Sequence, residues 1–480
     1  MTHSRFAAQA LLKAPTMRWL PLVCIIAACV PDSGTAPQQP DAAGVADSAI
    51  ASAPDAEVSP LDAALVATQE DASATQPQNA DAQPDLADAQ QQGQPDAQPA
   101  LTTIAGSLWR TTDFAAFALS DAERAGDGAV VMSANAGTMA TDPFGRGNYQ
   151  GGNYYNGGNY RYAVAVSPAI TWARPFDEVV PSFEVDTPAG TWVTIKISAR
   201  VQGRWTADYV LGVWAYESTT VRRHSVDDQD DADARVATDT LVLTRNADAL
   251  RMTVILFSES QTVTPRVRAL SISAIDTAAS PRADPPDRNV WGTILPVPMR
   301  SQMIYPDGGE VWCSPTSLTM LLAYWGNVLN NTALTQTVPH TAAMTLDWIY
   351  DGNGNWPFNT AHGSAAGGGV LHGFVTRLES FTQIERLIQV QIPVAISISY
   401  GRGQLSNSPI SSTAGHLIVI RGFARNGDVV SNDPAFGANA DVEVTYDRAE
   451  LEAAWSRSER TTYVLYPRNR VLPADPLGGF

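Results

Sequence analysis

Cys313 is the residue of this 480-residue chain whose type and position best suit covalent chemistry. It directly precedes Ser314-Pro315, and apolar residues recur at 318, 321, 322 and 325 up to Gly326, which predicts a buried helix over 313–326. Unpaired N–H groups and the helix dipole stabilise a thiolate at such an N-terminus, and the thiolate is the reactive form of cysteine. A cysteine that acts only as a small hydrophobe is more at home in mid-helix. The position therefore predicts a nucleophile.

A thiolate that attacks an acyl group also needs a general acid for the leaving group. Of the six histidines, His416 is best placed to supply one. It heads the apolar run 417–420, which is typical of a buried strand, and a side chain at the mouth of such a strand can project into a cleft.

The segment after this strand is expected to position Asp433. A four-residue turn at 424–427 pairs Phe423 with Asp428 and sets Asp433 opposite Ile418. Asp433 then shares a face with the histidine and lies diagonal to it, at about 7–8 Å between backbones. A carboxylate there orients the imidazole and stabilises its protonated form.

Four motifs together resemble the C39-like branch of the papain-like cysteine peptidases, over about residues 295–470. They are Gln302, the helix start Cys-Ser-Pro-Thr-Ser at 313–317, Gly-His at 415–416 and Asn-Asp-Pro at 432–434. The resemblance implies an α+β papain-like fold in which Cys313 attacks the substrate and His416 is the base and acid. It also implies that Asp433 orients the histidine and that Gln302 helps to bind the oxyanion.

Two features depart from the family pattern. Ser314 stands where the family commonly has glycine. The eleven-residue interval from Gln302 to Cys313 is longer than in the bacteriocin-processing members. Neither departure removes a reacting group, so the resemblance still implies an active hydrolase.

Three tryptophans are candidates for binding a peptide substrate: Trp312, Trp348 and Trp356. The last two flank the glycine-rich segment 351–355, where aromatic side chains fit a substrate groove and the hydrophobic core equally well. The sequence leaves both interpretations open.

The preceding part of the chain predicts a different unit. Residues 193–201 and 250–256 alternate apolar and polar side chains, and similar short runs recur from 101 to 276, which favours an antiparallel β-sandwich. We expect the proline-rich segment 277–289 to be a linker and 290–480 to be the peptidase-like domain. The repeated Gly-Gly-Asn-Tyr at 151 and 157 predicts a surface loop, and the aspartate run 227–233 predicts a solvated hairpin tip rather than a metal site.

The N-terminus predicts export. Basic residues precede the apolar run 19–28, which is too short to cross a bilayer, and Ile-Ala-Ala-Cys at 26–29 resembles the bacterial lipobox. We therefore expect 1–28 to be a signal peptide and Cys29 to carry lipid. Cys24 is then discarded, so Cys313 is the only thiol left in the folded part of an exported protein.

Residues 29–100 are expected to be a disordered tether. Twelve acidic and no basic side chains lie between 30 and 100, in a segment of Ala, Asp, Gln and Pro that cannot offset its ordering entropy. This segment holds most of the chain's net charge of −18, and no Lys/Arg cluster offers a footprint for nucleic acid.

The sequence as a whole predicts an exported bacterial lipoprotein of the cell envelope, at the outer membrane or cell surface. Its third domain is expected to be a cysteine peptidase that acts on a peptide or protein as a monomer, without cofactor or metal. The alternative is a non-hydrolytic adhesion or carbohydrate-binding lipoprotein with an inactive papain-like domain. Hydrolysis and acyl transfer to an amine stay indistinguishable at this level.

Overall fold

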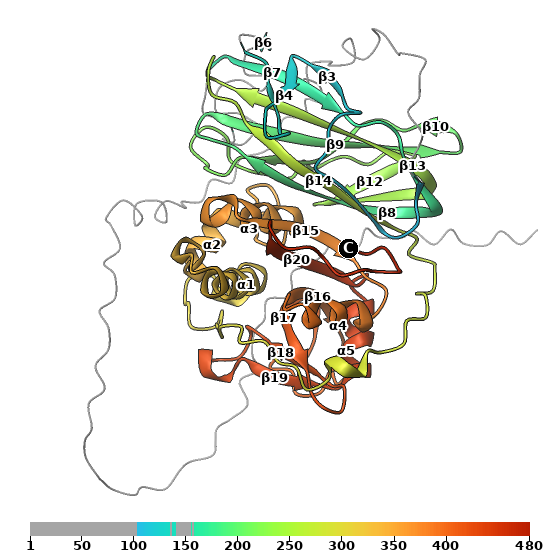
Figure 1. Cartoon of the computed structure of the whole chain (residues 1–480), viewed down its shortest axis with the longest axis vertical. Coiled ribbons are helices and arrows are strands. Elements are labelled where there is room, and N and C mark those ends of the chain that lie inside the picture. The colour runs from blue at the N-terminus through green and yellow to red at the C-terminus, as the bar shows by residue number, and fades with distance from the viewer. Residues whose placement is uncertain (1–102, 135–136, 141–154, 156–157) are drawn as a thin grey trace, which may run out of the picture.

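The computed structural model describes residues 103–134, 137–140, 155 and 158–480. The predicted signal peptide, Cys29, the tether and most of the Gly-Gly-Asn-Tyr repeat lie outside the described residues. Two sheets organise the described part, one above the other in Figure 1, with the strands predominantly antiparallel as predicted. Within that part, no helix has the length and apolarity to cross a membrane.

The first sheet is a fourteen-stranded sheet that folds over on itself. Its main path runs β10-β9-β13-β8-β14-β5-β4, and the long strand β13 pairs with β8 through residues 241–250 and with β7 through 253–258. The apolar residues predicted at alternate positions of 193–201 are all buried in the enclosed core. The strands are β1 (Thr103–Ile104), β2 (Leu108–Thr111), β3 (Ala118–Ser120), β4 (Ala122–Arg124), β5 (Val130–Met132), β6 (Thr138–Ala140), β7 (Tyr160–Val166), β8 (Ile170–Asp186), β9 (Thr191–Val201), β10 (Arg204–Trp205), β11 (Tyr209–Trp214), β12 (Ala234–Ala237), β13 (Thr240–Ser258) and β14 (Arg266–Ile275).

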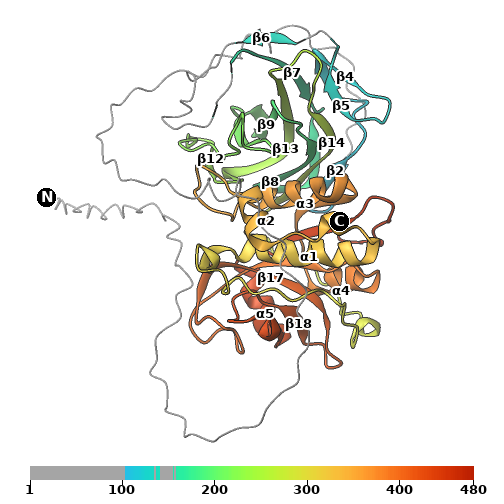
Figure 2. The same cartoon turned by 90° about the vertical axis from the view of Figure 1, so that its left-hand side faces the viewer.

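The second sheet has six antiparallel strands in the order β15-β20-β16-β17-β18-β19. Helices α1 and α3 pack together against it, and both lie on the side of the first sheet in Figure 2. The strands are β15 (Leu371–Arg377), β16 (Val394–Tyr400), β17 (Thr413–Phe423), β18 (Val429–Asn432), β19 (Glu443–Tyr446) and β20 (Thr461–Pro467). The helices are α1 (Cys313–Leu329), α2 (Val338–Thr345), α3 (Trp356–Gly369), α4 (Phe381–Gln389) and α5 (Arg448–Ser456), with short 3₁₀ turns η3 (Arg288–Val290), η4 (Gly309–Val311), η5 (Thr332–Leu334) and η6 (Asn439–Asp441).

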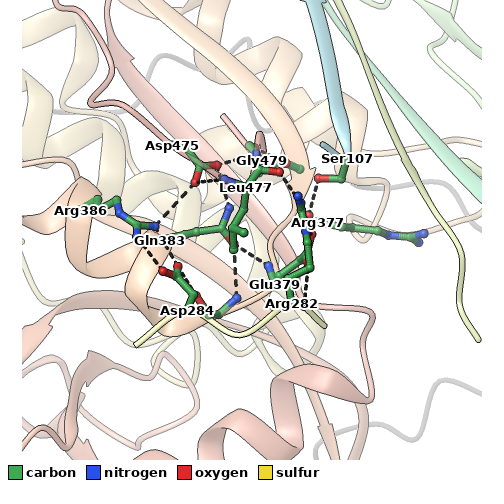
Figure 3. A network of polar contacts seen from close by, with 12 residues as sticks. Ser107, Arg282, Asp284, Arg377, Glu379, Gln383, Arg386, Asp475, Leu477 and Gly479 are labelled. Carbon is green, nitrogen blue, oxygen red and sulfur yellow. Dashed lines mark hydrogen bonds and ion pairs between the residues drawn. The ribbon is translucent and has the colours of Figure 1, made fainter. Parts of the chain in front are cut away.

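A polar network connects the segment between the two sheets to helix α4 and the last residues of the chain (Figure 3). The carboxylate of Asp284 accepts two hydrogen bonds from Arg386, at 2.8 and 2.7 Å. Gln383 donates from Nε2 to Asp475 Oδ2 at 2.8 Å, and the N–H of Leu477 donates to the same carboxylate at 3.1 Å. The segment predicted to be a linker is thus held by paired charges along the second unit.

Helix α1 begins at Cys313, as predicted, but the expected stop at Gly326 is wrong. The helix continues to Leu329 and ends at Asn330, whose positive φ of 51° terminates it. The glycine serves packing instead, because a Cβ at 326 would lie 3.0 Å from Thr335 Oγ1.

The hairpin of β17 and β18 differs from its predicted pairing in one place. Phe423 pairs with Val429 and not with Asp428, but a bulge between Ile420 and Gly422 restores the register, so that Val419 pairs with Asn432. Strand β18 ends at Asn432, one residue before Asp433, and the same register continued by one residue would set Asp433 opposite Ile418. The bulge accompanies a close approach of the segment 293–295, since a Cβ on Gly422 would lie 2.1 Å from the carbonyl oxygen of Thr293.

Candidate functional site

Cys313 is half-buried at the first position of α1. Burial raises the pKa of its thiol, but hydrogen bonding with His416 and the nearby imidazolium charge outweigh burial. Backbone N–H groups at Leu417 and Ser314 lower the pKa further. The net result is a pKa below the usual 9.0, which increases the thiolate fraction at neutral pH.

His416 and Asp433 form a fully buried pair at the end of β17 nearest to this cysteine. Nε2 of the imidazole lies 2.7 Å from Oδ1 of the carboxylate, and neither side chain is exposed to solvent. Nδ1 has no oxygen or nitrogen partner among the described residues, which leaves it available to the Cys313 thiol. The ring therefore contacts the carboxylate through Nε2 and also interacts with the Cys313 thiol.

The charges of this group reinforce one another. Burial lowers the pKa of His416, but the charge and hydrogen bond of Asp433, together with Cys313, raise it well above 6.5. Burial raises the pKa of Asp433, but the imidazolium holds it below 3.8. The arrangement thus favours a thiolate–imidazolium pair flanked by an ionised carboxylate, which combines a nucleophile with a proton donor.

Tyr446 is a fourth member of the site that sequence reasoning missed. Its hydroxyl donates to Asp433 Oδ2 at 2.7 Å, while the N–H of Ala435 donates to Oδ1 at 2.9 Å. The tyrosine reaches the carboxylate because β19 pairs with β18, and no sequence pattern indicated that pairing.

Replacing Tyr446 with phenylalanine is expected to reduce kcat/KM by about tenfold, the usual cost of one hydrogen bond to a charged group. Asp433 then loses a donor that partly neutralises it, so the pKa of His416 rises and the alkaline limb of the pH–rate profile moves upward. Tyr324→Phe, at another buried tyrosine of this unit whose hydroxyl donates to the carbonyl of Gln391, is the matched control. If the alkaline limb of the pH–rate profile does not move in Tyr446→Phe, the hydroxyl of Tyr446 does not influence His416 and the side chain serves packing alone.

Gln302 lies between the segment that carries Asp433 and the start of helix α1. Its backbone N–H donates to the carbonyl of Pro434 at 2.9 Å, and its side-chain Nε2 donates to the carbonyl of Glu310 at 3.0 Å, just before the nucleophile helix. The side chain is fully buried, and Oε1 has no hydrogen-bond partner in the described part of the chain. The long interval between Gln302 and Cys313 folds into a tight turn that brings Gly309 back to Gln302. A Cβ on Gly309 would lie 2.2 Å from the carbonyl oxygen of Gln302, so the turn requires glycine at this position.

Ser314, the other departure from the family pattern, also has a structural partner. Its buried hydroxyl lies 2.9 Å from the hydroxyl of Tyr463 on β20. The contact fixes the first turn of α1, which carries Cys313, against strand β20 of the second sheet.

The three candidate tryptophans lie in two different places. Trp312 adjoins Cys313, and its ring is 6.0 Å from that of Tyr305. Trp348 and Trp356 lie instead at the contact with the first unit: the guanidinium of Arg222 is 4.2 Å from the Trp348 ring, and the N–H of Trp356 donates to Asp239 at 2.6 Å. The structure does not gather them into one surface around the cysteine.

The aspartate run 227–233 makes hydrogen bonds and an ion pair within the first unit. Asp231 accepts from the hydroxyl of Tyr209 at 2.7 Å, and Asp233 pairs with Arg204. Within the described ranges, no group of three His, Cys, Asp or Glu side chains is arranged to hold a metal ion.

Comparisons with known proteins were made for the whole chain. No curated protein matches it. Among solved structures, a Bacillus anthracis protein named as a C39-like peptidase is 17% identical, with 37% of this chain and 98% of that chain covered and a TM-score of 0.28. A carbohydrate-binding module from the β-sandwich superfamily is 12% identical, with 36% and 62% covered and a TM-score of 0.14. Both scores are too low to establish a shared fold.

Family comparisons cover both units. Residues 106–274 match the Peptidase C39 N-terminal domain, and the region includes most strands of the first sheet. Residues 294–463 match the Peptidase_C39 like family, and this region contains Gln302, Cys313, His416 and Asp433. The chain therefore belongs to the C39-like peptidase family.

Proposed function

We propose that this protein is a cysteine peptidase that hydrolyses peptide bonds through Cys313, His416 and Asp433, in a papain-like domain. The observation that carries the proposal is the fully buried His416–Asp433 pair beside a thiol of lowered pKa. A histidine buried only for packing would be driven toward its neutral form by the same burial. Family membership supports peptidase chemistry, since both matching families are named for peptidase C39.

In the proposed reaction, the Cys313 thiolate attacks the carbonyl carbon of a peptide bond and forms a tetrahedral intermediate. A backbone N–H near Cys313 stabilises its oxyanion together with the second Nε2 hydrogen of Gln302, whose first hydrogen is donated to the carbonyl of Glu310. His416 donates its Nδ1 proton to the leaving amine, so the C–N bond breaks and a thioester remains. The neutral imidazole then takes a proton from water, the hydroxide attacks the thioester, and release of the acid regenerates the thiolate–imidazolium pair.

The decisive experiment compares proteome cleavage by the wild-type protein with cleavage by Cys313→Ala. We expect new peptide termini only with the wild type, together with loss of labelling by a thiol alkylator in the variant. Circular dichroism and thermal unfolding provide the folding control, because the half-buried thiol is small and the serine at 314 still anchors the helix. Equal cleavage by both proteins would refute the mechanism.

The non-hydrolytic binding alternative has no comparable support in the described residues. Tyr155 and Tyr160, in and beside the Gly-Gly-Asn-Tyr repeat, are 3% and 5% exposed. They pack around Trp192 and Phe257. These rings form a small core on the first sheet and do not present a flat face to a sugar.

We further propose that the protein is exported and anchored to the cell envelope as a monomer, with a signal peptide over 1–28, lipid on Cys29 and an extended acidic tether to residue 100. The first unit then spans about 101–276 and the peptidase unit 290–480, with 277–289 between them. These assignments rest on the lipobox-like Ile-Ala-Ala-Cys and the composition of residues 30–100.

Replacing Cys29 with alanine is expected to release the protein from the membrane fraction, because the lipid is its only proposed anchor. Cell fractionation in a bacterial host measures the change, and metabolic labelling with a fatty-acid analogue reports the lipid directly. Cys24→Ala is the matched control, since that residue belongs to the discarded segment. Labelling that persists in Cys29→Ala would contradict lipidation at this position.

A further inference from the structure

The outermost strand of the second sheet, β15, is covered in an unusual way. It pairs with β20 on one side only, so alternate backbone N–H groups point away from the sheet. An open strand edge of this kind readily pairs with another strand, and natural proteins usually protect it. In this protein the first unit lies directly against it (Figure 1).

Side chains of the first sheet take the place of a neighbouring strand along β15. Three outward N–H groups find acceptors on β8 and β14: Gly373 donates to Glu184 at 3.2 Å, Val375 to Ser182 Oγ at 2.8 Å, and Arg377 to Ser273 Oγ at 3.0 Å. At the end of the strand, Ser107 Oγ donates to the carbonyl of Arg377 at 2.7 Å. Three N–H groups and one carbonyl of this edge are therefore satisfied without β pairing.

The first sheet is specialised for this contact. Ser182 and Ser273 are completely buried and Glu184 is 2% exposed, although a sheet face that packs against another unit normally presents apolar side chains. The charge of Glu184 is balanced by Arg110 at 2.9 Å and Arg468 at 2.8 Å. Small hydroxyl residues leave room for the incoming backbone, and a buried hydroxyl without a partner would cost free energy.

We propose that the first unit serves as a built-in cover for the β15 edge, which prevents this edge from pairing with the same edge of a second copy of the chain. This role does not depend on the peptidase activity. Measurements of amide hydrogen exchange and of self-association are therefore sufficient to test it.

Amide-resolved hydrogen–deuterium exchange of the full chain tests the contact. Ser182→Ala removes the acceptor of the Val375 amide, and Ser273→Ala removes that of Arg377, so each variant is expected to speed exchange at its own amide by at least tenfold. Ser198→Ala, at a buried serine on β9 away from the contact, is the matched control. General loosening would instead accelerate both amides together with those of β16.

Sedimentation of the Ser182→Ala/Ser273→Ala double variant tests the cover itself. We expect concentration-dependent self-association that the wild type and Ser198→Ala lack. Ser182→Thr, which keeps the hydroxyl acceptor, provides a folded comparison if the double variant is unstable, and it should retain protection of the Val375 amide. Unchanged exchange at Val375 and Arg377, or a double variant that stays monomeric with both amides unprotected, would overturn the proposal.

Discussion

Replacing His416 with alanine is expected to lower kcat/KM for a peptide substrate by about 10⁴-fold or more, because the base and the proton donor are lost together. Alanine leaves the buried Asp433 without its partner, so some loss of stability is expected as well. Activity should therefore be measured under conditions in which circular dichroism shows the variant to be folded.

The same variant separates a catalytic from a structural histidine through the chemistry of Cys313. Hydrogen bonding and charge from His416 lower the thiol pKa, whereas burial raises it. Without the imidazole, burial dominates, and the pH midpoint for alkylation by iodoacetamide is expected to move upward past 9.0. In the wild type the midpoint is expected to lie below that value.

His340→Ala is the matched control for both measurements. His340 is an exposed histidine of the same unit, on α2, and its backbone N–H is capped by Thr337. We expect this variant to keep wild-type kcat/KM and the wild-type alkylation midpoint. A His416→Ala protein with an unchanged midpoint would show that the thiol is not activated by this ring.

The sequence was most informative where one residue type in one local pattern determines the geometry. Ser314-Pro315 and the apolar spacing were sufficient to place Cys313 at a helix start, and strand parity was sufficient to bring Asp433 next to His416. The pairing survived an incorrect turn because the bulge near Gly422 compensates for the extra turn residue. Which face of the sheet a residue lies on depends on the number of residues between it and its partner. The extra residue in the turn and the extra residue in the bulge lie on opposite strands, so they cancel and the predicted face is kept.

Features that depend on contacts distant in sequence were not predictable. Tyr446 reaches Asp433 only through the pairing of β18 with β19, and Trp356 contacts Asp239 only because the first unit docks on α3. In the sequence, Ser182 and Ser273 are indistinguishable from serines on the solvent-facing side of a strand. Their burial is explained only by the backbone of β15, whose N–H groups at Val375 and Arg377 donate to them. Alternation indicates which residues share a face but not what that face meets.

Replacing Asp433 with asparagine is expected to lower kcat/KM by about 10⁴-fold while the fold is retained, because the amide keeps the size of the side chain but loses its charge. The imidazolium is then no longer stabilised, and the neutral ring can adopt the wrong tautomer toward Cys313. Asp428→Asn, at an aspartate in the turn of the same hairpin, is the matched control and should leave activity unchanged. A near-normal rate in Asp433→Asn would remove the carboxylate from the mechanism.

The pH dependence of stability gives this variant a second readout. In the wild type the folded pKa of His416 lies above 6.5, so its stabilising effect is fully present below pH 6.5 and is lost as pH rises through the folded pKa. Asp433 has a folded pKa below 3.8, so its contribution is present above that pH and is lost only on further acidification.

In the asparagine variant, burial dominates at His416 and lowers its pKa. The contribution of His416 to the free energy of unfolding of this variant therefore increases as pH rises toward 6.5. The difference in Tm between wild type and variant is therefore expected to be largest at about pH 4–5, where Asp433 is still ionised, and to shrink as the pH rises through 6.5. Thermal unfolding of both proteins across this range measures it, and a difference that grows with pH would contradict the raised pKa of His416.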